Sequence, residues 1–234
     1  MTKYWVLRSN ESEYMKCPRC VQLIHRAAAV CPHCGYGMAD ADRMFGDSEV
    51  KLRSLTDAAG IFRRNERDRL EDEMERIGIA FPQVFVAVYT GRVGEMANLR
   101  QFGFWLLNRG LFEDMPVEKP NEAGILIVID PDSKAAGMTF GYLLDPFLEE
   151  QDTFDCLSRA HAYWLEGRYM DGVLKCLNQL RKLLRKRSRQ ARRDPERYQR
   201  KAAPTEAAGN PVRKIHEASR PAAAQSEEVK GVAR

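Results

Sequence analysis

The sequence lacks long hydrophobic runs: no stretch approaches the roughly 18 apolar residues that a membrane-spanning helix requires. Its first residues, Met1-Thr2-Lys3-Tyr4-Trp5, also lack the basic segment followed by an apolar segment that marks a signal peptide. The P-loop, G-x-S-x-G and H-E-x-x-H patterns are missing as well. We therefore expect a soluble, cytoplasmic protein that belongs to none of these enzyme classes.

Positive charge is present but unevenly spread. The chain has 234 residues and a net charge of +4, enough length for one well-buried domain of about 100–150 residues with smaller attachments. Residues 181–201 contain eleven Lys and Arg against Asp194 and Glu196, so this segment carries +9 and the rest of the chain −5. A slightly acidic body is thus expected to carry a basic tail, which would suit an anionic partner such as a nucleic acid or a membrane surface.

Four of the six cysteines form two Cys-Pro-x-Cys pairs separated by ten residues, namely Cys17, Cys20, Cys31 and Cys34. This spacing predicts four thiolates around one Zn2+, a closed coordination sphere and therefore a structural metal. Disulfides are the alternative, but they fit a reducing compartment poorly. The pattern resembles a small rubredoxin-like zinc ribbon over about residues 15–38. His25 and His33 are alternative ligands that the four thiolates make unnecessary.

The strongest structural signal is the apolar, β-branched run at residues 124–129, which predicts a central strand buried on both faces. A turn at 130–134 and a strand at 135–140 complete a hairpin. Helices are expected at about 64–78, 95–108, 153–166 and 169–186, another strand at 82–90, and a helix cap at Asp145-Pro146. This alternation predicts an α/β/α sandwich with a central mixed sheet.

These elements predict four segments. Residues 1–38 form the N-terminal segment with the zinc ribbon, 39–53 a linker, 54–187 the α/β/α domain, and 188–234 a basic, disordered tail that is poor in aromatic residues. Cys156 and Cys176 fall on the last two predicted helices, where they are expected to be small core residues.

An ordered series of motifs resembles the TPM domain family over about residues 54–184. It consists of Asp57-Ala58-Ala59-Gly60, the buried strand, Asp130 with Asp132, Gly141-Tyr142, and residues 164–172. The resemblance implies an α/β/α sandwich. It also implies relationship to proteins that include an acid phosphatase, photosystem repair factors and respiratory-complex assembly proteins, with divalent cations bound in some members.

The aspartates are the candidate second site. Asp130 and Asp132 follow the buried strand, and Asp57 matches the aspartate of the family's opening motif. Ligands of open α/β sheets collect beyond the carboxyl ends of the strands, and carboxylate oxygens suit Ca2+ or Mg2+. The alternative is that Asp130 and Asp132 belong to a tight turn and that Asp57 is a turn or capping residue.

The chain departs from the family pattern at several positions. Glu122-Ala123 interrupts the usual Asn-Gly pair, Lys134 replaces an arginine, Leu143 replaces a glycine, and Arg63 stands at the expected helix cap. These departures favour a non-enzymatic, metal-binding interaction or assembly module whose partner is another protein. A phosphatase acting through the acidic edge is the first alternative, and a nucleic-acid-associated protein using the ribbon and tail is the second.

Overall fold

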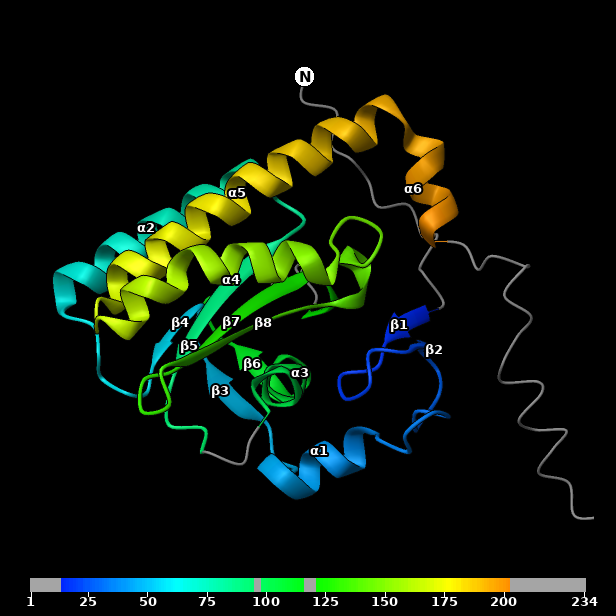
Figure 1. The fold of residues 1–234 in the computed structure, drawn as a ribbon, viewed down its shortest axis with the longest axis horizontal. Coiled ribbons are helices and arrows are strands. Elements are labelled where there is room, and N and C mark those ends of the chain that lie inside the picture. Colours follow the sequence, from blue (N-terminus) through cyan, green and yellow to red (C-terminus); the bar gives the residue numbers. More distant parts are fainter. Residues whose placement is uncertain (1–13, 95–97, 116–120, 203–234) are drawn as a thin grey trace, which may run out of the picture. The chain divides into compact units, whose positions relative to one another are not determined.

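The computed structural model describes residues 14–94, 98–115 and 121–202. Its strands are β1 Tyr14–Lys16, β2 Leu23–His25, β3 Val50–Leu52, β4 Leu55–Asp57, β5 Phe85–Thr90, β6 Gly110–Phe112, β7 Gly124–Asp130 and β8 Ala135–Phe140. Its helices are α1 Met38–Phe45, α2 Arg64–Ala80, α3 Leu99–Arg109, α4 Glu150–Leu165, α5 Tyr169–Arg193 and α6 Pro195–Ala202, with the 3-10 turns η1 Asn121–Ala123 and η2 Tyr142–Leu144. Figure 1 shows their arrangement.

A mixed four-stranded sheet in the order β4-β5-β7-β8 forms the centre of the domain. β4, β5 and β7 run parallel, and β8 returns antiparallel to β7, which confirms the predicted hairpin. Every residue of β7 is buried, including the apolar run 124–129 that predicted a central strand and the polar Asp130 that ends it. The register aligns Asp57 with Thr90 and Thr90 with Ile129, so the carboxyl ends of the three parallel strands meet at one edge.

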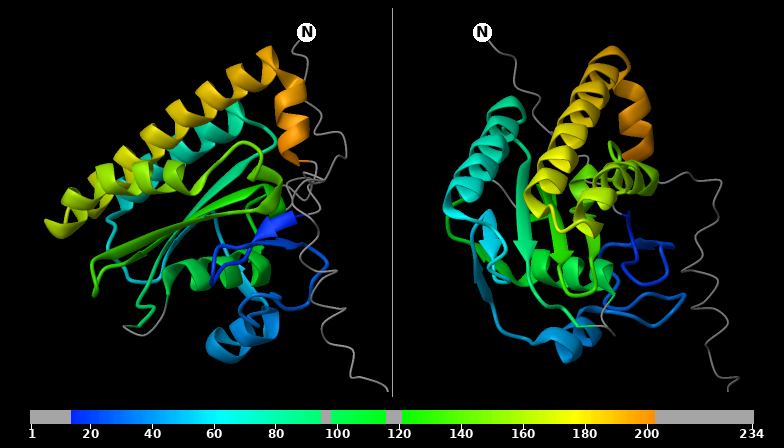
Figure 2. Two further views of the ribbon diagram at one scale, coloured as in Figure 1. Left: turned by 45° about the vertical axis from the view of Figure 1, so that its right-hand side comes forward. Right: turned by 60° about the vertical axis from the view of Figure 1, so that its left-hand side comes forward.

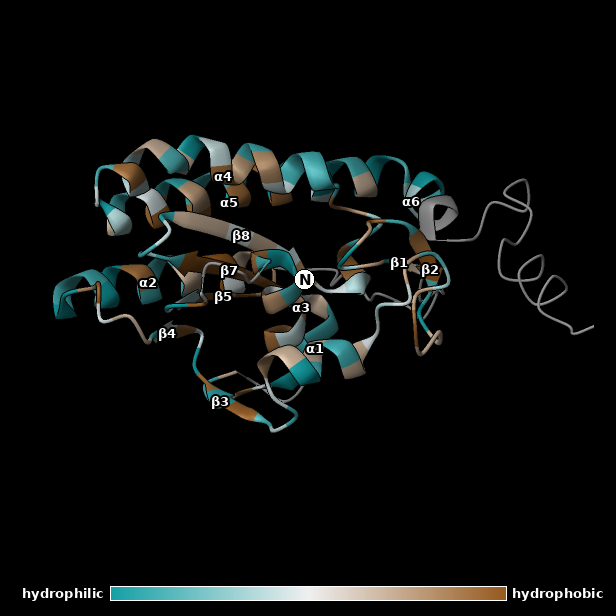
Figure 3. Ribbon diagram, turned by 60° about the horizontal axis from the view of Figure 1, so that its bottom comes forward, coloured by the Kyte–Doolittle hydropathy of each residue, from teal (hydrophilic) through white to brown (hydrophobic). Residues whose placement is uncertain are grey.

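Helices cover both faces of this sheet, which confirms the α/β prediction (Figures 1 and 2). Side chains alternate along each strand: Val86 and Ile127 pack with α2, α4 and α5, whereas Ala87 and Val128 pack with α3. Apolar side chains buried on both faces supply the main free energy of folding, at about 25 cal/mol per Å² of area removed from water. The hydropathy colouring of Figure 3 shows these strands as an apolar layer beneath more polar helices.

The segment 39–53 differs from our prediction of a linker, because it contains most of α1 together with β3. α1 is only eight residues long and buries Ala41 alone, so it has no sustained apolar period to reveal it. Distant polar contacts hold it in place. Arg109 donates to both carboxylate oxygens of Asp42, at 2.9 and 2.6 Å, and the indole nitrogen of Trp105 donates to the carbonyl oxygen of Gly46 at 2.7 Å.

The C-terminal prediction also needs correction. Ordered structure does not end at residue 187: α5 continues to Arg193, and α6 follows at once, with Tyr198 stacked on Phe147 at a ring-centroid distance of 5.3 Å. The remainder of the predicted disordered tail, residues 203–234, lies outside the described residues. Within the described residues, no helix is both long and apolar enough to cross a membrane.

One predicted helix start was wrong, and another falls outside the described residues. Asp145-Pro146 does not cap a helix; it follows η2, and α4 begins at Glu150. α3 begins at Leu99, and the side chain of Asn98 accepts hydrogen bonds from the amides of Arg100 and Gln101. Residues 95–97, where we predicted the start of this helix, lie outside the described residues. Asn98 is a preferred N-cap residue, so the cap decides where this helix starts.

Candidate metal centre

The four predicted cysteines lie on two loops with the same backbone pattern. In the first loop, between β1 and β2, the amide of Cys17 donates to Gln22 and the amide of Val21 donates to Cys17. In the second loop, Cys31 donates to Tyr36 and Gly35 donates to Cys31. A bridge between Val30 and Gly37 closes this second loop. The two loops therefore form two equivalent knuckles.

The residue after each second cysteine adopts a left-handed backbone conformation. Gly35 has φ +72°, a backbone conformation that glycine adopts at little cost in free energy. Val21 has φ +65° at the equivalent position of the first knuckle. This conformation is unfavourable for a β-branched residue, so the first knuckle carries backbone strain.

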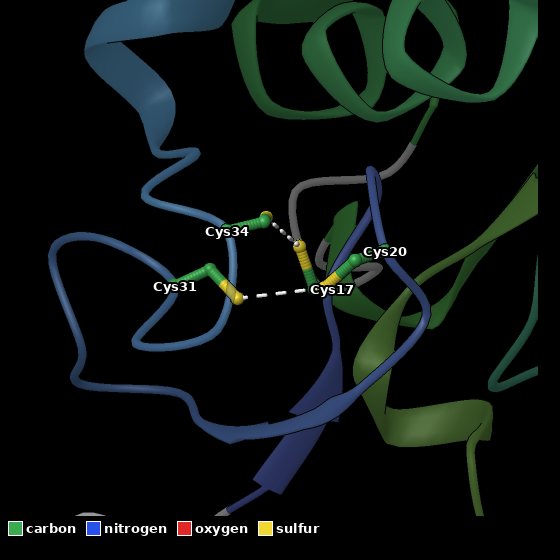
Figure 4. A group of neighbouring side chains, drawn as sticks. All are labelled: Cys17, Cys20, Cys31 and Cys34. Atoms are coloured by element: carbon green, nitrogen blue, oxygen red, sulfur yellow. Dashed lines mark hydrogen bonds between the residues drawn. The ribbon is translucent and has the colours of Figure 1, made fainter. Parts of the chain in front are cut away.

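The knuckles bring the four sulfur atoms into one group, shown in Figure 4. The Cys17 and Cys34 sulfurs are 3.7 Å apart, the Cys20 and Cys31 sulfurs 3.6 Å, and all four lie within 4.8 Å of one another. A tetrahedron with Zn–S bonds of about 2.3 Å has edges of about 3.8 Å. A disulfide needs about 2.05 Å. The four cysteines are free, and their spacing fits a tetrathiolate metal site.

The environment of the sulfurs requires a cation if all four are to be ionised. A hydrogen bond from the amide of Gln22 lowers the pKa of Cys20 to about 7. Burial raises the pKa of Cys17 to about 12 and also raises that of Cys34. Buried thiolates without a counter-ion are costly, so ionisation of the whole group is tied to metal binding. Soft thiolate ligands in tetrahedral geometry suit zinc, and four of them leave no open position for catalysis.

The ribbon is attached to the α/β domain rather than separate from it. The Arg26 guanidinium lies over the Tyr142 ring, 5.5 Å from its centroid, and donates to its hydroxyl at 3.4 Å. Tyr36, 4% exposed, joins the apolar cluster that contains Phe102 and Trp105 of α3. Sequence reasoning missed these contacts because Arg26 and Tyr142 are 116 positions apart.

A groove of about 880 Å³ lies where the ribbon meets the domain. Its walls come from both parts and include Ile24, Arg26, Tyr36, Phe104, Asn108 and Tyr142. The hydroxyl oxygens of Tyr36 and Thr139, which also line it, are buried and have no hydrogen-bond partner among the described residues. Buried hydroxyls are nearly always hydrogen-bonded, so these two are exceptions; the Thr139 hydroxyl lies against Gly103 of α3.

The inserted pair Glu122-Ala123 also lies beside this groove. The pair belongs to η1. Gly124 follows it, and the carbonyl oxygen of Gly124 accepts a hydrogen bond from the amide of Gly141 at 2.9 Å. A Cβ atom on Gly141 would clash with the carbonyl oxygen of Glu122, so only glycine allows the two segments to approach. Glu122 and Gly141 thus form part of a groove wall.

The structure does not bring the three aspartates into one cluster. Among the described residues, the group of at least three His, Cys, Asp or Glu whose ligand atoms lie within 4.8 Å is the cysteine group alone. Asp57 ends β4 and Asp130 ends β7, with β5 between them, so their backbones are separated by two strand spacings, about 10 Å.

Each aspartate has other partners. Asp57 accepts hydrogen bonds from the amides of Ile61 and Phe62, the hydroxyl of Thr90 and the guanidinium of Arg67. Buried Asp130 accepts from the amide of Asp132, and exposed Asp132 pairs with Arg92 at 3.1 Å. These contacts agree with the turn and capping alternative; the cation site stays a prediction.

Comparison with known proteins identifies no family for the chain. No family model matches it, and no curated protein matches it. One similar solved structure is the N-terminal domain of a protein from P. gingivalis, with 19% identity, a TM-score of 0.43, and coverage of 64% of this chain and 91% of that one. Another is the N-terminal domain of the cg2496 protein from Corynebacterium glutamicum, with 10% identity, a TM-score of 0.44, and coverage of 58% and 82%. Such distant likenesses carry no functional argument.

Proposed function

We propose that this chain is a cytoplasmic, TPM-like interaction or assembly module, stabilised by one structural zinc ion, that binds a protein partner in the groove between ribbon and domain. The observation that carries the proposal is the groove itself, whose walls come from both parts. The cysteine group supports this role, because a closed tetrathiolate site holds a loop in position without taking part in chemistry.

The partner surface we propose is an extended peptide segment. Apolar walls such as Ile24 and Phe104 suit its side chains, and the exposed polar side chains of Arg26 and Asn108 suit its backbone carbonyls. Such segments combine backbone hydrogen bonds with side-chain pockets.

The alternative reaction, phosphate release, has little support among the described residues. A carboxylate nucleophile must be free to attack, yet both oxygens of Asp57 are engaged by donors. Cys156 and Cys176 are fully buried, as predicted for core residues, and burial raises the pKa of Cys156 to about 12. A thiol that stays protonated in the core is a poor nucleophile.

The test is affinity purification of the full chain from its source with two matched double variants. Asn108→Arg with Ala27→Arg places large cations at exposed positions in the groove wall. Asn65→Arg with Ala162→Arg makes the same chemical changes at exposed positions of α2 and α4. We expect a co-purifying protein that the control retains and the groove variant loses.

Two outcomes would contradict the proposal. One is equal recovery of every partner by the groove variant and the control. The other is release of phosphate from phosphomonoesters by the wild type that disappears in Asp132→Asn, which would favour the phosphatase alternative instead.

A further inference from the structure

The exposed cations of α5 gather on one face of the helix. With about 100° of rotation per residue, they fall within an arc of about 120°. We name this set the basic stripe; its members are Lys175, Lys182, Arg185, Lys186, Arg189, Arg192 and Arg193. At about 1.5 Å per residue, the stripe extends for about 27 Å. Figure 1 shows α5 as the long helix on the outer side of the sheet.

The opposite face of α5 is fixed in the core. Val173, Leu177, Leu180, Leu184 and Ala191 are buried there. Since these side chains pack against the domain, α5 cannot roll over to present them elsewhere. The basic stripe is therefore held outward on a rigid element.

Cations of α5 outside the stripe have carboxylate partners. Arg181 pairs with Glu73 at 3.4 Å, and Arg187 pairs with Asp152 at 2.9 Å. Among the described residues, no stripe member forms an ion pair, so their charges repel one another. An ordinary structural role thus accounts for the two off-stripe arginines and not for the stripe.

The helix dipole explains only part of the pattern. Cations near a helix C-terminus are favourable by about 0.3–1 kcal/mol each, but the effect falls off within the last turn. It therefore applies to Arg192 and Arg193. Lys175, Lys182, Arg185 and Lys186 lie too far from the end of the helix.

We propose that the basic stripe binds the phosphate backbone of a nucleic acid. Six of its seven members lie between Lys182 and Arg193 at spacings of one or three residues, and four of the six are arginines, which pair with phosphates in two-point contacts. Those residues together span about 16 Å, a length over which duplex DNA carries roughly ten phosphate charges. The stripe contains no aromatic residue to stack on bases, so recognition is of the backbone and is independent of sequence.

An anionic membrane is the less favoured occupant. Helices that lie in a membrane surface bury an apolar face in the lipid, whereas the apolar face of α5 is already buried in the protein. The stripe itself offers no apolar side chain for insertion.

The test measures binding of the full chain to a labelled 20-base-pair duplex of arbitrary sequence by fluorescence anisotropy, between 50 and 200 mM salt. If four or five phosphates are neutralised, affinity should fall roughly 150- to 500-fold over this range. The stripe variant Lys186→Gln, Arg189→Gln, Arg193→Gln should bind at least tenfold more weakly at 50 mM salt and show a shallower salt dependence.

The control variant Arg64→Gln, Arg69→Gln, Arg159→Gln removes the same charge from exposed positions of α2 and α4 and should bind like the wild type. Thermal unfolding of both variants checks that they are folded. The proposal is overturned by absence of binding at 50 mM salt, by equal loss in both variants, or by binding to phosphatidylserine vesicles without binding to the duplex. These results leave the groove proposal untouched, because its test uses other residues.

Discussion

At the residue scale, Val21 is the clearest conflict between sequence and structure. Its left-handed conformation costs an L-residue about 1–2 kcal/mol. Replacement by glycine removes this cost, but the greater flexibility of glycine in the unfolded chain offsets about 0.5–1 kcal/mol of the gain. Val21 is 40% exposed, so little apolar burial is lost on replacement. We expect Val21→Gly to raise the melting temperature of the metal-loaded protein by about 2–4 °C.

Gly35→Val supplies the opposite change in the equivalent position of the other knuckle. A Cβ atom on Gly35 meets nothing within 4 Å, so the substitution tests backbone conformation alone. It should lower the melting temperature by a similar amount. A Val21→Gly protein that melts below the wild type would show that the valine side chain matters more than the strain.

Asp145 provides a pH-dependent prediction. Burial raises its pKa to about 6, opposed by Lys16, with Glu150 raising it further and Arg100 lowering it. Between about pH 4 and pH 6, the folded state holds a proton that the unfolded state has lost, so the contribution of Asp145 to stability falls as pH rises. Above about pH 6 the ionised, partly buried carboxylate lowers the free energy of unfolding by an amount that no longer changes with pH.

Asp145→Asn removes that cost. We expect the variant to be more stable than the wild type by about 2 kcal/mol at pH 8, since a pKa difference of one unit is worth about 1.4 kcal/mol and the site is only partly buried. At pH 3.5 the two proteins should have equal stability. Denaturant unfolding at the two pH values measures both; a difference that stays constant with pH would exclude the ionisation of Asp145 as its cause.

At the element scale, Asp57 joins β4, β5 and the start of α2. Burial opposes its ionisation, but hydrogen bonds from Thr90, Phe62 and Ile61 and the charge of Arg67 together lower its pKa. Asparagine has one acceptor oxygen where aspartate has two, so its amide group would face donors. We expect Asp57→Asn to destabilise the fold by about 2–4 kcal/mol near neutral pH.

The sign of this change separates the two interpretations of the acidic edge. If the aspartates are cation ligands that repel one another, removing one charge should stabilise the metal-free protein. If Asp57 is instead held by hydrogen bonds, removing its charge should destabilise the protein. Asp132→Asn is the matched control and should change stability by less than about 1 kcal/mol, because Asp132 belongs to an exposed ion pair. A melting temperature that rises with Ca2+ or Mg2+ in the wild type but not in Asp132→Asn would support the cation site.

Local sequence was sufficient to predict some elements and insufficient for others. β7 was predictable because six of its seven buried residues form an unbroken apolar run, and the cysteine group because two Cys-Pro-x-Cys pairs have the spacing typical of metal ligands. α1 and β3 were not, since they are short and are held by partners such as Arg109, 67 positions from Asp42. The role of Asp57 likewise depends on Thr90, which only the pairing of β4 with β5 brings near.

At the scale of the whole molecule, we expect metal binding at the cysteine group to stabilise the contact between the ribbon and the domain. We expect the purified protein to contain one tightly bound zinc ion per chain, which elemental analysis of protein prepared under reducing conditions will measure. Cys17→Ser should release it. Protein that folds with no bound metal and retains an ordered ribbon would contradict the zinc assignment.

Loss of the metal should reach beyond the ribbon while leaving the α/β domain folded. Tyr36 directly follows the second knuckle and is buried against α3, and burying a side chain of this kind contributes about 1.5–3 kcal/mol. Unfolding of the ribbon removes that contribution and the Arg26–Tyr142 contact. The domain of the Cys17→Ser variant should therefore melt roughly 4–10 °C below that of the wild type.

Tyr36→Ala tests this coupling from the other side. It removes the contact with α3 but none of the four ligands, so it should lower the melting temperature by a similar amount while retaining one zinc ion per chain. If Cys17→Ser and Tyr36→Ala together are no worse than Cys17→Ser alone, both act through the same interface, because energies that share a partner do not add. Full additivity would instead mean that the metal and the ribbon interface stabilise the protein independently, and the groove would then persist without zinc.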